Sequence, residues 1–86
     1  ERLLAAHIYR ILSESKNLDQ CVSETHDYVV EQIDAIEGLK VQYFSIVDGK
    51  TLADVDSWDD AESVVGCITV YCGAVPIRLI DHIRYK

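Results

Sequence analysis

The sequence has little cysteine, proline and glycine, and it has no methionine. Its three cysteines, Cys21, Cys67 and Cys72, are odd in number and contain no CxxC pair, so their spacing specifies neither a disulfide framework nor a zinc site. The four glycines form no G-x-G-x-x-G or P-loop pattern, which excludes a phosphate-binding loop of these types. We therefore expect reduced, buried and inert thiols in a chain that has no phosphate cradle of its own.

Long hydrophobic runs are absent as well. No run of about eighteen apolar residues occurs, which is the length that a membrane-spanning helix needs. The first ten residues, ERLLAAHIYR, lack the basic start and the small-residue cleavage site of a signal peptide. These features predict a cytoplasmic protein that does not associate with a membrane.

Positive charge is scarce over most of the chain. The formal net charge is −7, and residues 19–62 carry twelve acidic residues against Lys40 and Lys50, a net of −10. Residues 78–86 reverse this balance, with three basic residues against Asp81, a net of +2. Because most of such a surface repels phosphate backbones, we expect no nucleic-acid partner.

What the sequence does contain is typical of one small folded domain. Hydrophobic residues make up 49% of the chain and charged residues 27%, a composition that favours folding over disorder. A chain of 86 residues is too short for two separate cores, because a domain of this size buries only about 60–65% of its unfolded surface. We expect a single domain over residues 1–86, without a large active-site cleft.

Apolar residues recur at helical spacing near the N-terminus. From residue 2 to residue 15 they follow the positions i, i+4, i+7 and i+8, which predicts an amphipathic helix. The members of this stripe are Leu4, Ile8, Ile11 and Leu12.

A second helix is predicted to follow the first. Asn17 and Gln20 have the spacing of a capping box, and Asp19 would lie in the first turn. Gly38 supplies the left-handed residue at which helices often end. The buried stripe of this helix is expected to contain Leu18, Val22, Thr25, Val29, Ile33 and Ile36.

Strand patterns occupy the rest of the chain. Residues 40–47, KVQYFSIV, are apolar on both sides of a strand, which favours cover on both faces. The following DGKT predicts a turn in which Gly49 is free to take a positive φ. Residues 63–72 are almost wholly apolar and predict the central strand of a small sheet. Pro76 fits the entry to the last strand, residues 77–86, because proline cannot donate to a ladder.

These elements together define a fold class. Residues 53–62 show neither helical nor strand period and predict a loop with a short helical turn. The last two strands are joined tightly enough to pair as an antiparallel hairpin. The order helix, helix, strand, loop, strand, strand predicts an α+β, two-layer sandwich. In this sandwich two N-terminal helices pack on a small three-stranded, mainly antiparallel sheet.

Alternation divides the last strand into two sides. If its apolar side packs on the helices, Asp81 becomes a buried carboxylate that needs a donor or a cation and acts as a structural anchor. Arg78, His82 and Arg84 then point outward. They either protect an edge strand by charge or form a basic face toward an anionic ligand or a partner domain, and spacing alone favours edge protection.

Acidic residues cluster in two places. In the loop, an EF-hand pattern that starts at Asp54 fails, because Asp59 falls where glycine is needed and Val65 falls where the glutamate belongs. We therefore expect no metal site and interpret the loop as solvated. On the second helix an acidic face has no Lys or Arg to pair with, which favours an exposed, solubilising face over a docking surface for a basic partner. Its members are Glu24, Asp27, Glu31 and Asp34.

Three segments carry a family resemblance. Residues 43–52, YFSIVDGKTL, look like the Tyr-x-x-Ile-Val-Asp-x-x-Thr-Leu segment of pantothenate synthetases, the pantoate–β-alanine ligases. Residues 5–12, AAHIYRIL, are similar to the Ala-rich, Leu-Tyr-Arg helix that opens the C-terminal domain of that family. Residues 78–83 resemble its RLIDNI ending, with His82 where the family usually has Asn. Gly49 stands where the family often has Pro.

The resemblance implies that the chain is the C-terminal lid domain of a larger ligase, whose nucleotide-binding domain precedes it. The family makes pantoyl adenylate from pantoate and ATP, with Mg²⁺, and β-alanine then displaces AMP to give pantothenate. Its HxGH-like motif, its Ser-Arg-Asn stretch and its homodimer contacts lie outside this chain. We therefore assign no catalytic, cofactor-binding or metal residue here, and we expect the chain alone to be inactive. Arg78, His82 and Arg84 remain candidates for facing the cleft or the missing domain.

An alternative belongs to a different class of function. The chain could be a free-standing, non-catalytic interaction module that binds a basic partner through its acidic helix face and acidic loop. Salt-sensitive capture of such a partner would favour the module, whereas a nucleotide-binding domain encoded upstream would favour the ligase.

Overall fold

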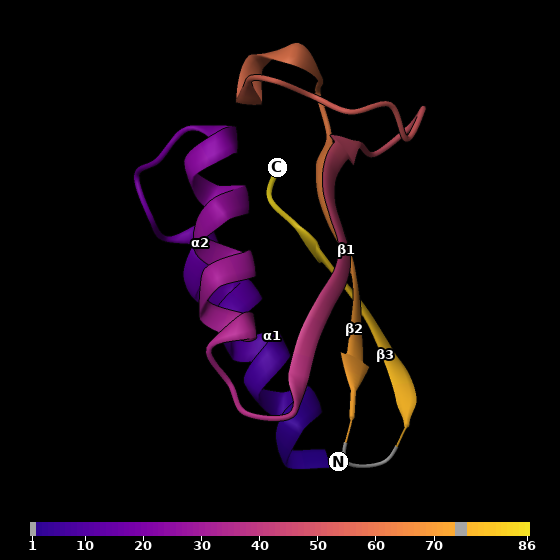
Figure 1. The fold of residues 1–86 in the computed structure, drawn as a ribbon. Helices are drawn as coiled ribbons and strands as arrows, with labels where there is room; N and C mark the ends of the chain where they lie inside the picture. Colours follow the sequence, from indigo (N-terminus) through magenta and orange to yellow (C-terminus); the bar gives the residue numbers. More distant parts are fainter. Residues whose placement is uncertain (1, 74–75) are drawn as a thin grey trace.

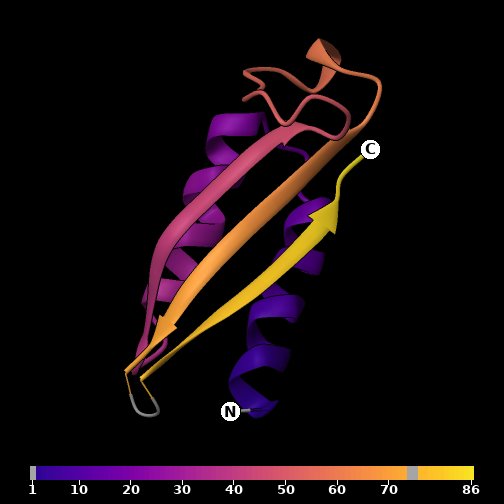
Figure 2. The same cartoon turned by 90° about the vertical axis from the view of Figure 1, so that its right-hand side faces the viewer.

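The computed structural model describes residues 2–73 and 76–86. Its elements are α1 (Arg2–Lys16), α2 (Val22–Asp34), β1 (Leu39–Asp48), the short 3-10 helix η1 (Trp58–Asp60), β2 (Val64–Cys72) and β3 (Ile77–Arg84). The two helices form one layer, and an antiparallel sheet of order β1-β2-β3 forms the other (Figures 1 and 2). This arrangement confirms the predicted α+β, two-layer sandwich.

The core lies between the helices and one side of the sheet. Strand β2 shows the alternation that this position requires, because every second residue from Val64 to Cys72 is buried. The predicted central place of this strand is therefore confirmed. The predicted stripes of the helices supply the other half of the core, which contains Ile8, Ile11, Leu12, Val22, Val29 and Ile33.

The second helix begins and ends at different residues from those predicted. Its N-cap is Cys21, whose backbone N–H donates to the carboxylate of Glu24, so the predicted capping box of Asn17 and Gln20 is wrong. The N-cap lies four residues after Asn17, and residues 17–20 form the connection between the two helices. At the other end the helix stops at Asp34, and Gly38 takes its positive φ of 89° in the turn that enters β1.

Strand β1 is covered on both sides only near its end, where Ile46 and Val47 point in opposite directions and are each 4% exposed. A bulge between Val41 and Tyr43 shifts the register, and after it Phe44 and Ile46 point into the core. Tyr43 points to the opposite side and is 54% exposed. Cover on both faces, which the apolar sequence favoured, is therefore confirmed at the end of the strand, at Ile46 and Val47, but not at Tyr43. The side of the sheet away from the helices, which we call the outer face, is open.

The turn after β1 uses its residues differently from the prediction. The positive φ falls on Leu52, at 64°, and not on Gly49. Gly49 is instead closely packed, because a Cβ there would displace the hydroxyl of Ser63 and lie 3.1 Å from its Cβ. The carboxylate of Asp48 accepts a hydrogen bond of 2.7 Å from the backbone N–H of Lys50, and this bond lowers the pKa of Asp48 below its usual 3.8.

The free edge of β1 is occupied by groups from outside the sheet. The carboxylate of Asp34 accepts from the N–H of Val41 at 2.8 Å. A ring nitrogen of His26 lies 3.1 Å from the carbonyl oxygen of Phe44, and the carbonyl of Ile46 accepts from the N–H of Val55. Helix α2 and the loop thus satisfy much of the polar backbone that an edge strand leaves open.

The C-terminal hairpin has the pairing and the proline position that the sequence predicts. β2 and β3 pair antiparallel from Val65 with Arg84 to Cys72 with Ile77, which confirms the hairpin. Pro76 lies in the turn directly before β3, as expected. No described helix has both the length and the apolar character needed to cross a membrane.

Candidate functional site

The outer face of β3 carries the basic residues that the sequence singled out. Arg78, His82 and Arg84 are all exposed and alternate along the strand, so their predicted outward direction is confirmed. The guanidinium Nε of Arg78 donates to the side-chain oxygen of Gln42 on β1 at 2.9 Å, which links the two edge strands across the outer face. The Nε of Arg84 donates to the carbonyl of Lys86. Both arginines keep further N–H donors for a partner.

Apolar side chains lie beside these cations. Ile80 is 79% exposed and pairs with Thr69 of β2, and Tyr43 lies opposite the same threonine on β1. Large apolar side chains so exposed on one open sheet side are typical of a contact surface. The outer face therefore combines two cationic guanidiniums with an apolar centre.

Asp81 is less buried than the sequence predicts. It lies on the helix-facing side of β3, as alternation predicts, but it is half-buried and is not the predicted buried anchor. Its carboxylate accepts a hydrogen bond of 2.8 Å from the adjacent N–H of His82. Burial along this side of β3 increases from Ile77, which is exposed, to Ile83, which is buried, so Asp81 falls where the helix layer covers the strand only in part.

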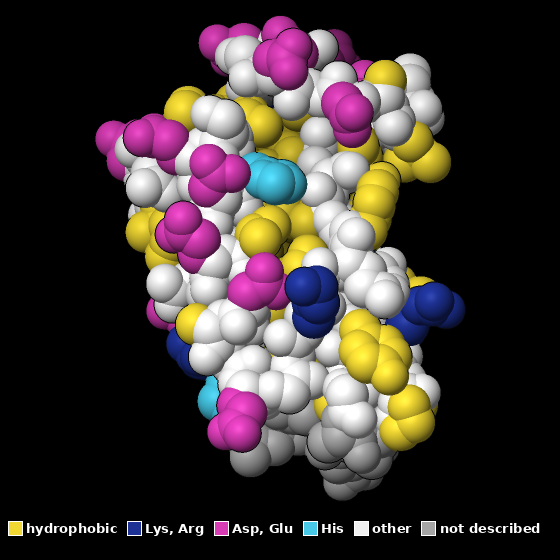
Figure 3. Space-filling model, in the orientation of Figure 1, with side chains coloured by type: hydrophobic (Ala, Val, Ile, Leu, Met, Phe, Trp, Pro, Cys, Tyr) yellow, Lys and Arg dark blue, Asp and Glu magenta, His cyan; other side chains and the backbone are white. Residues whose placement is uncertain are grey.

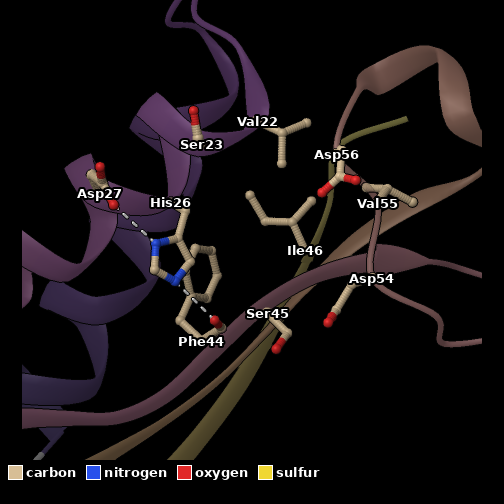
Figure 4. Close-up of a pocket in the computed structure, with 10 residues that line it drawn as sticks. All are labelled: Val22, Ser23, His26, Asp27, Phe44, Ser45, Ile46, Asp54, Val55 and Asp56. Atoms are coloured by element: carbon tan, nitrogen blue, oxygen red, sulfur yellow. Dashed lines mark hydrogen bonds and ion pairs between the residues drawn. The ribbon is translucent and has the colours of Figure 1, made fainter.

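A second candidate surface lies at the opposite edge of the sheet. Acidic side chains gather over α2 and over the loop, and a histidine and apolar side chains lie in the hollow between them (Figure 3). The hollow has a volume of about 320 Å³. We call it the acidic groove, and it is lined by Val22, Ser23, His26, Asp27, Phe44, Ser45, Ile46, Asp54, Val55 and Asp56 (Figure 4). The sequence predicted both acidic clusters but not that they share one hollow.

His26 forms one wall of the acidic groove. Its ring stacks on Phe44 with centroids 5.4 Å apart, and its Nε2 lies 3.1 Å from the carbonyl oxygen of Phe44. Its Nδ1 lies 3.2 Å from a carboxylate oxygen of Asp27 (Figure 4). These contacts fix the ring between α2 and β1. Local spacing could not reveal this role, because Phe44 lies eighteen residues further along the chain.

The three thiols are free and differ in exposure. Cys72 is buried and Cys67 half-buried, whereas Cys21 is exposed, which corrects the expectation that all three are buried. Cys21 serves as the N-cap of α2, where its sulfur lies 3.2 Å from the carboxylate of Glu24. Across residues 2–73 and 76–86, no three His, Cys, Asp or Glu side chains gather closely enough to hold a metal ion.

A part-buried polar contact joins the end of α1 to the C-terminal residues of the chain. The hydroxyl of Ser15 donates to the carbonyl of Leu12 at 2.6 Å and shares a hydrogen bond of 2.7 Å with the hydroxyl of Tyr85. Since the one proton of Ser15 is used on Leu12, the tyrosine is the donor in the second bond. Burial raises the pKa of Tyr85 above its usual 10.0. The partners are seventy residues apart, so the sequence could not predict this structural contact.

The sequence of the chain matches that of known proteins. Residues 1–84 match the family model described as pantoate–β-alanine ligase. A pantothenate synthetase from Bacteroides thetaiotaomicron is 50% identical over the whole chain, and one from Porphyromonas gingivalis is 46% identical. The chain spans 30% and 31% of the length of these two relatives, and the matched part is their C-terminal region. The chain belongs to the pantoate–β-alanine ligase family.

Proposed function

We propose that this chain is the C-terminal lid domain of a pantothenate synthetase. The proposal is supported by the family match and by relatives that bear this name and are about three times longer than the matched region. The greater length of these relatives favours the hypothesis that the chain is part of a ligase over the hypothesis that it is a free-standing interaction module. In the full enzyme a nucleotide-binding domain would precede the lid, and homodimer contacts would lie on that domain.

The reaction that we propose for the full enzyme has two steps. The pantoate carboxylate attacks the α-phosphorus of ATP, which releases pyrophosphate and forms pantoyl adenylate. The amine of β-alanine then attacks the acyl carbon, and AMP leaves as pantothenate forms. The described residues offer neither a glycine-rich phosphate cradle nor a metal-holding cluster, so ATP and Mg²⁺ would bind to the preceding domain. We expect the chain alone to be inactive and the enzyme to work in the cytoplasm.

The observation that carries the lid proposal is the open outer face. One side of the sheet packs on the helices, whereas the other side exposes apolar and cationic side chains without a second layer over the described residues. An acyl adenylate is destroyed by water, so closing a cleft with such a face would protect it. Adenylate, ATP and pyrophosphate are anions, and guanidinium groups bind phosphate oxygens well. Arg78, His82 and Arg84 would therefore face the cleft or the larger domain.

Kinetics of the full-length enzyme can test this role. We expect Arg78→Ala and Arg84→Ala each to lower kcat/KM for pantothenate formation by about tenfold, the loss expected for a charged hydrogen bond. Arg10→Ala is the matched control, because Arg10 is an exposed arginine on α1 that pairs with Glu14 on the same helix. Wild-type kinetics in both β3 variants would contradict a role for this face. His82→Asn introduces the usual family residue and is expected to retain activity.

A further inference from the structure

The acidic groove at the edge of β1 has no part in the lid proposal, which concerns the opposite side of the molecule. We propose that it is a docking groove for an arginine side chain that a basic segment of polypeptide presents. The inference does not depend on the ligase function, because binding can be measured without ATP or turnover.

The floor of the groove is apolar. Val22, Phe44, Ile46 and Val55 are buried residues that line it. A volume of about 320 Å³ is at the small end of ligand pockets and suits one side chain better than a cofactor. The three methylenes of an arginine can cover such a floor while the charged end stays near water.

The rim of the groove is negative. Asp54 and Asp56 lie on the loop side with their carboxylates directed toward the hollow, and Asp27 lies across from them on α2 (Figure 4). The side chains of Asp54 and Asp56 form no hydrogen bond or ion pair with any described residue. Among the described side chains, no Lys or Arg lines the groove. Its charge therefore complements a cation and repels phosphate or carboxylate ligands.

Arginine fits this arrangement better than lysine or a metal ion. Its planar guanidinium can bridge two carboxylates and can stack on an aromatic ring, and the His26 ring stacked on Phe44 forms a wall beside the rim. The carboxylates are not gathered closely enough to hold a metal within the described residues. Exposed Glu24 and Glu31 extend the negative charge along α2 beyond the hollow. A basic peptide would use this extension, and a single small cation would not.

The direct test is a titration of the ¹⁵N-labelled chain with the peptide Ac-Ala-Leu-Arg-Leu-Ala-NH₂, followed by amide chemical shifts. We expect saturable shifts at His26, Ser45 and Val55. The matched peptide with citrulline in place of arginine keeps the shape and loses the charge, and we expect it to bind at least about fivefold more weakly. Equal binding of the two peptides, or shifts confined to β3, would overturn the proposal.

Two variants locate the binding to the groove. Asp56→Asn should weaken binding of the arginine peptide about two- to fivefold, as expected for loss of one exposed ion pair. Asp59→Asn removes the same charge from the same loop but at a residue that does not line the groove, so it should leave the affinity within about 1.5-fold. If Asp56→Asn disturbs the fold, seen as shifts throughout the spectrum, Asp54→Asn replaces it. Equal effects of the groove variant and Asp59→Asn would show nonspecific attraction and refute the docking groove.

Discussion

Two isoleucines of β3 show how differently the two sides of the sheet are used. Ile83 points toward the helices and is 6% exposed, whereas Ile80 points to the outer face and is 79% exposed. They belong to the same strand, three residues apart, and differ only in what lies opposite them. Packing on the inner side therefore stabilises the fold, while the outer side exposes apolar surface that no described residue covers.

Truncating the two isoleucines should affect stability very differently. Ile83→Ala should lower the free energy of unfolding by about 2–4 kcal/mol, because it removes buried methyl groups and leaves a cavity. Ile80→Ala should change it by less than about 0.5 kcal/mol, because the side chain is already in water. Urea unfolding of both variants measures the difference. Equal losses would mean that the outer face is covered in solution.

Gly66 and Gly73 differ in the space that surrounds them. A Cβ on Gly66 would lie 2.8 Å from the ring of Tyr85 and 3.1 Å from the ring of Phe44, so Gly66→Ala should overpack the inner side and cost about 1–3 kcal/mol. A Cβ on Gly73 would meet its nearest atom at 3.8 Å, so Gly73→Ala should be tolerated. Thermal melting of the two variants distinguishes these outcomes.

Tyr85 supplies a smaller effect that depends on pH. Tyr85→Phe should cost about 1 kcal/mol at pH 7, because it removes the hydrogen bond to Ser15. The folded-state pKa of Tyr85 lies above 10.0, so its contribution is complete below pH 10 and is lost as the pH rises through that folded-state value. The stability difference between wild type and variant should therefore shrink in strong alkali. Tyr9→Phe, at a 57% exposed position, is the control and should leave the stability at pH 7 unchanged.

The smallest effect concerns Asp48 at the end of β1. Its pKa is lowered, so its contribution to stability is present above pH 3.8 and is lost as the pH falls through the lower folded-state value. Asp48→Asn keeps an oxygen for the N–H of Lys50 but cannot titrate. Melting curves between pH 5 and pH 2, a range of about three units around the ordinary carboxyl pKa, should be flatter for the variant. An unchanged slope would contradict the role of this carboxylate.

Local spacing was sufficient to predict much of the fold. The apolar stripe through Ile8 and Leu12 and the alternation of β2 are properties of neighbouring residues, and both recur in the structure. The position of Cys21 as N-cap was not predicted, because Asn17 and Gln20 have the stronger local capping pattern. In the structure these two residues belong to the connection between the helices.

The candidate sites were predicted less completely. Alternation gave the outward direction of Arg78 and Arg84, but it could not show that the helix layer stops short of Asp81. The acidic groove depends on contacts between α2, β1 and the loop, such as that of His26 with Phe44. The indole N–H of Trp58 likewise reaches the carbonyl of Gln20, thirty-eight residues away. Contacts of this kind form between residues far apart in the sequence, so a short stretch of residues cannot predict them.

The occupied edge of β1 also affects how this chain behaves at high concentration. A fibril grows when a strand offers unpaired backbone groups on which another copy can add. Asp34, His26 and Val55 already occupy such groups on β1. We therefore expect the isolated chain to resist amyloid-type assembly along this strand, even though much of its other surface is left open for partners.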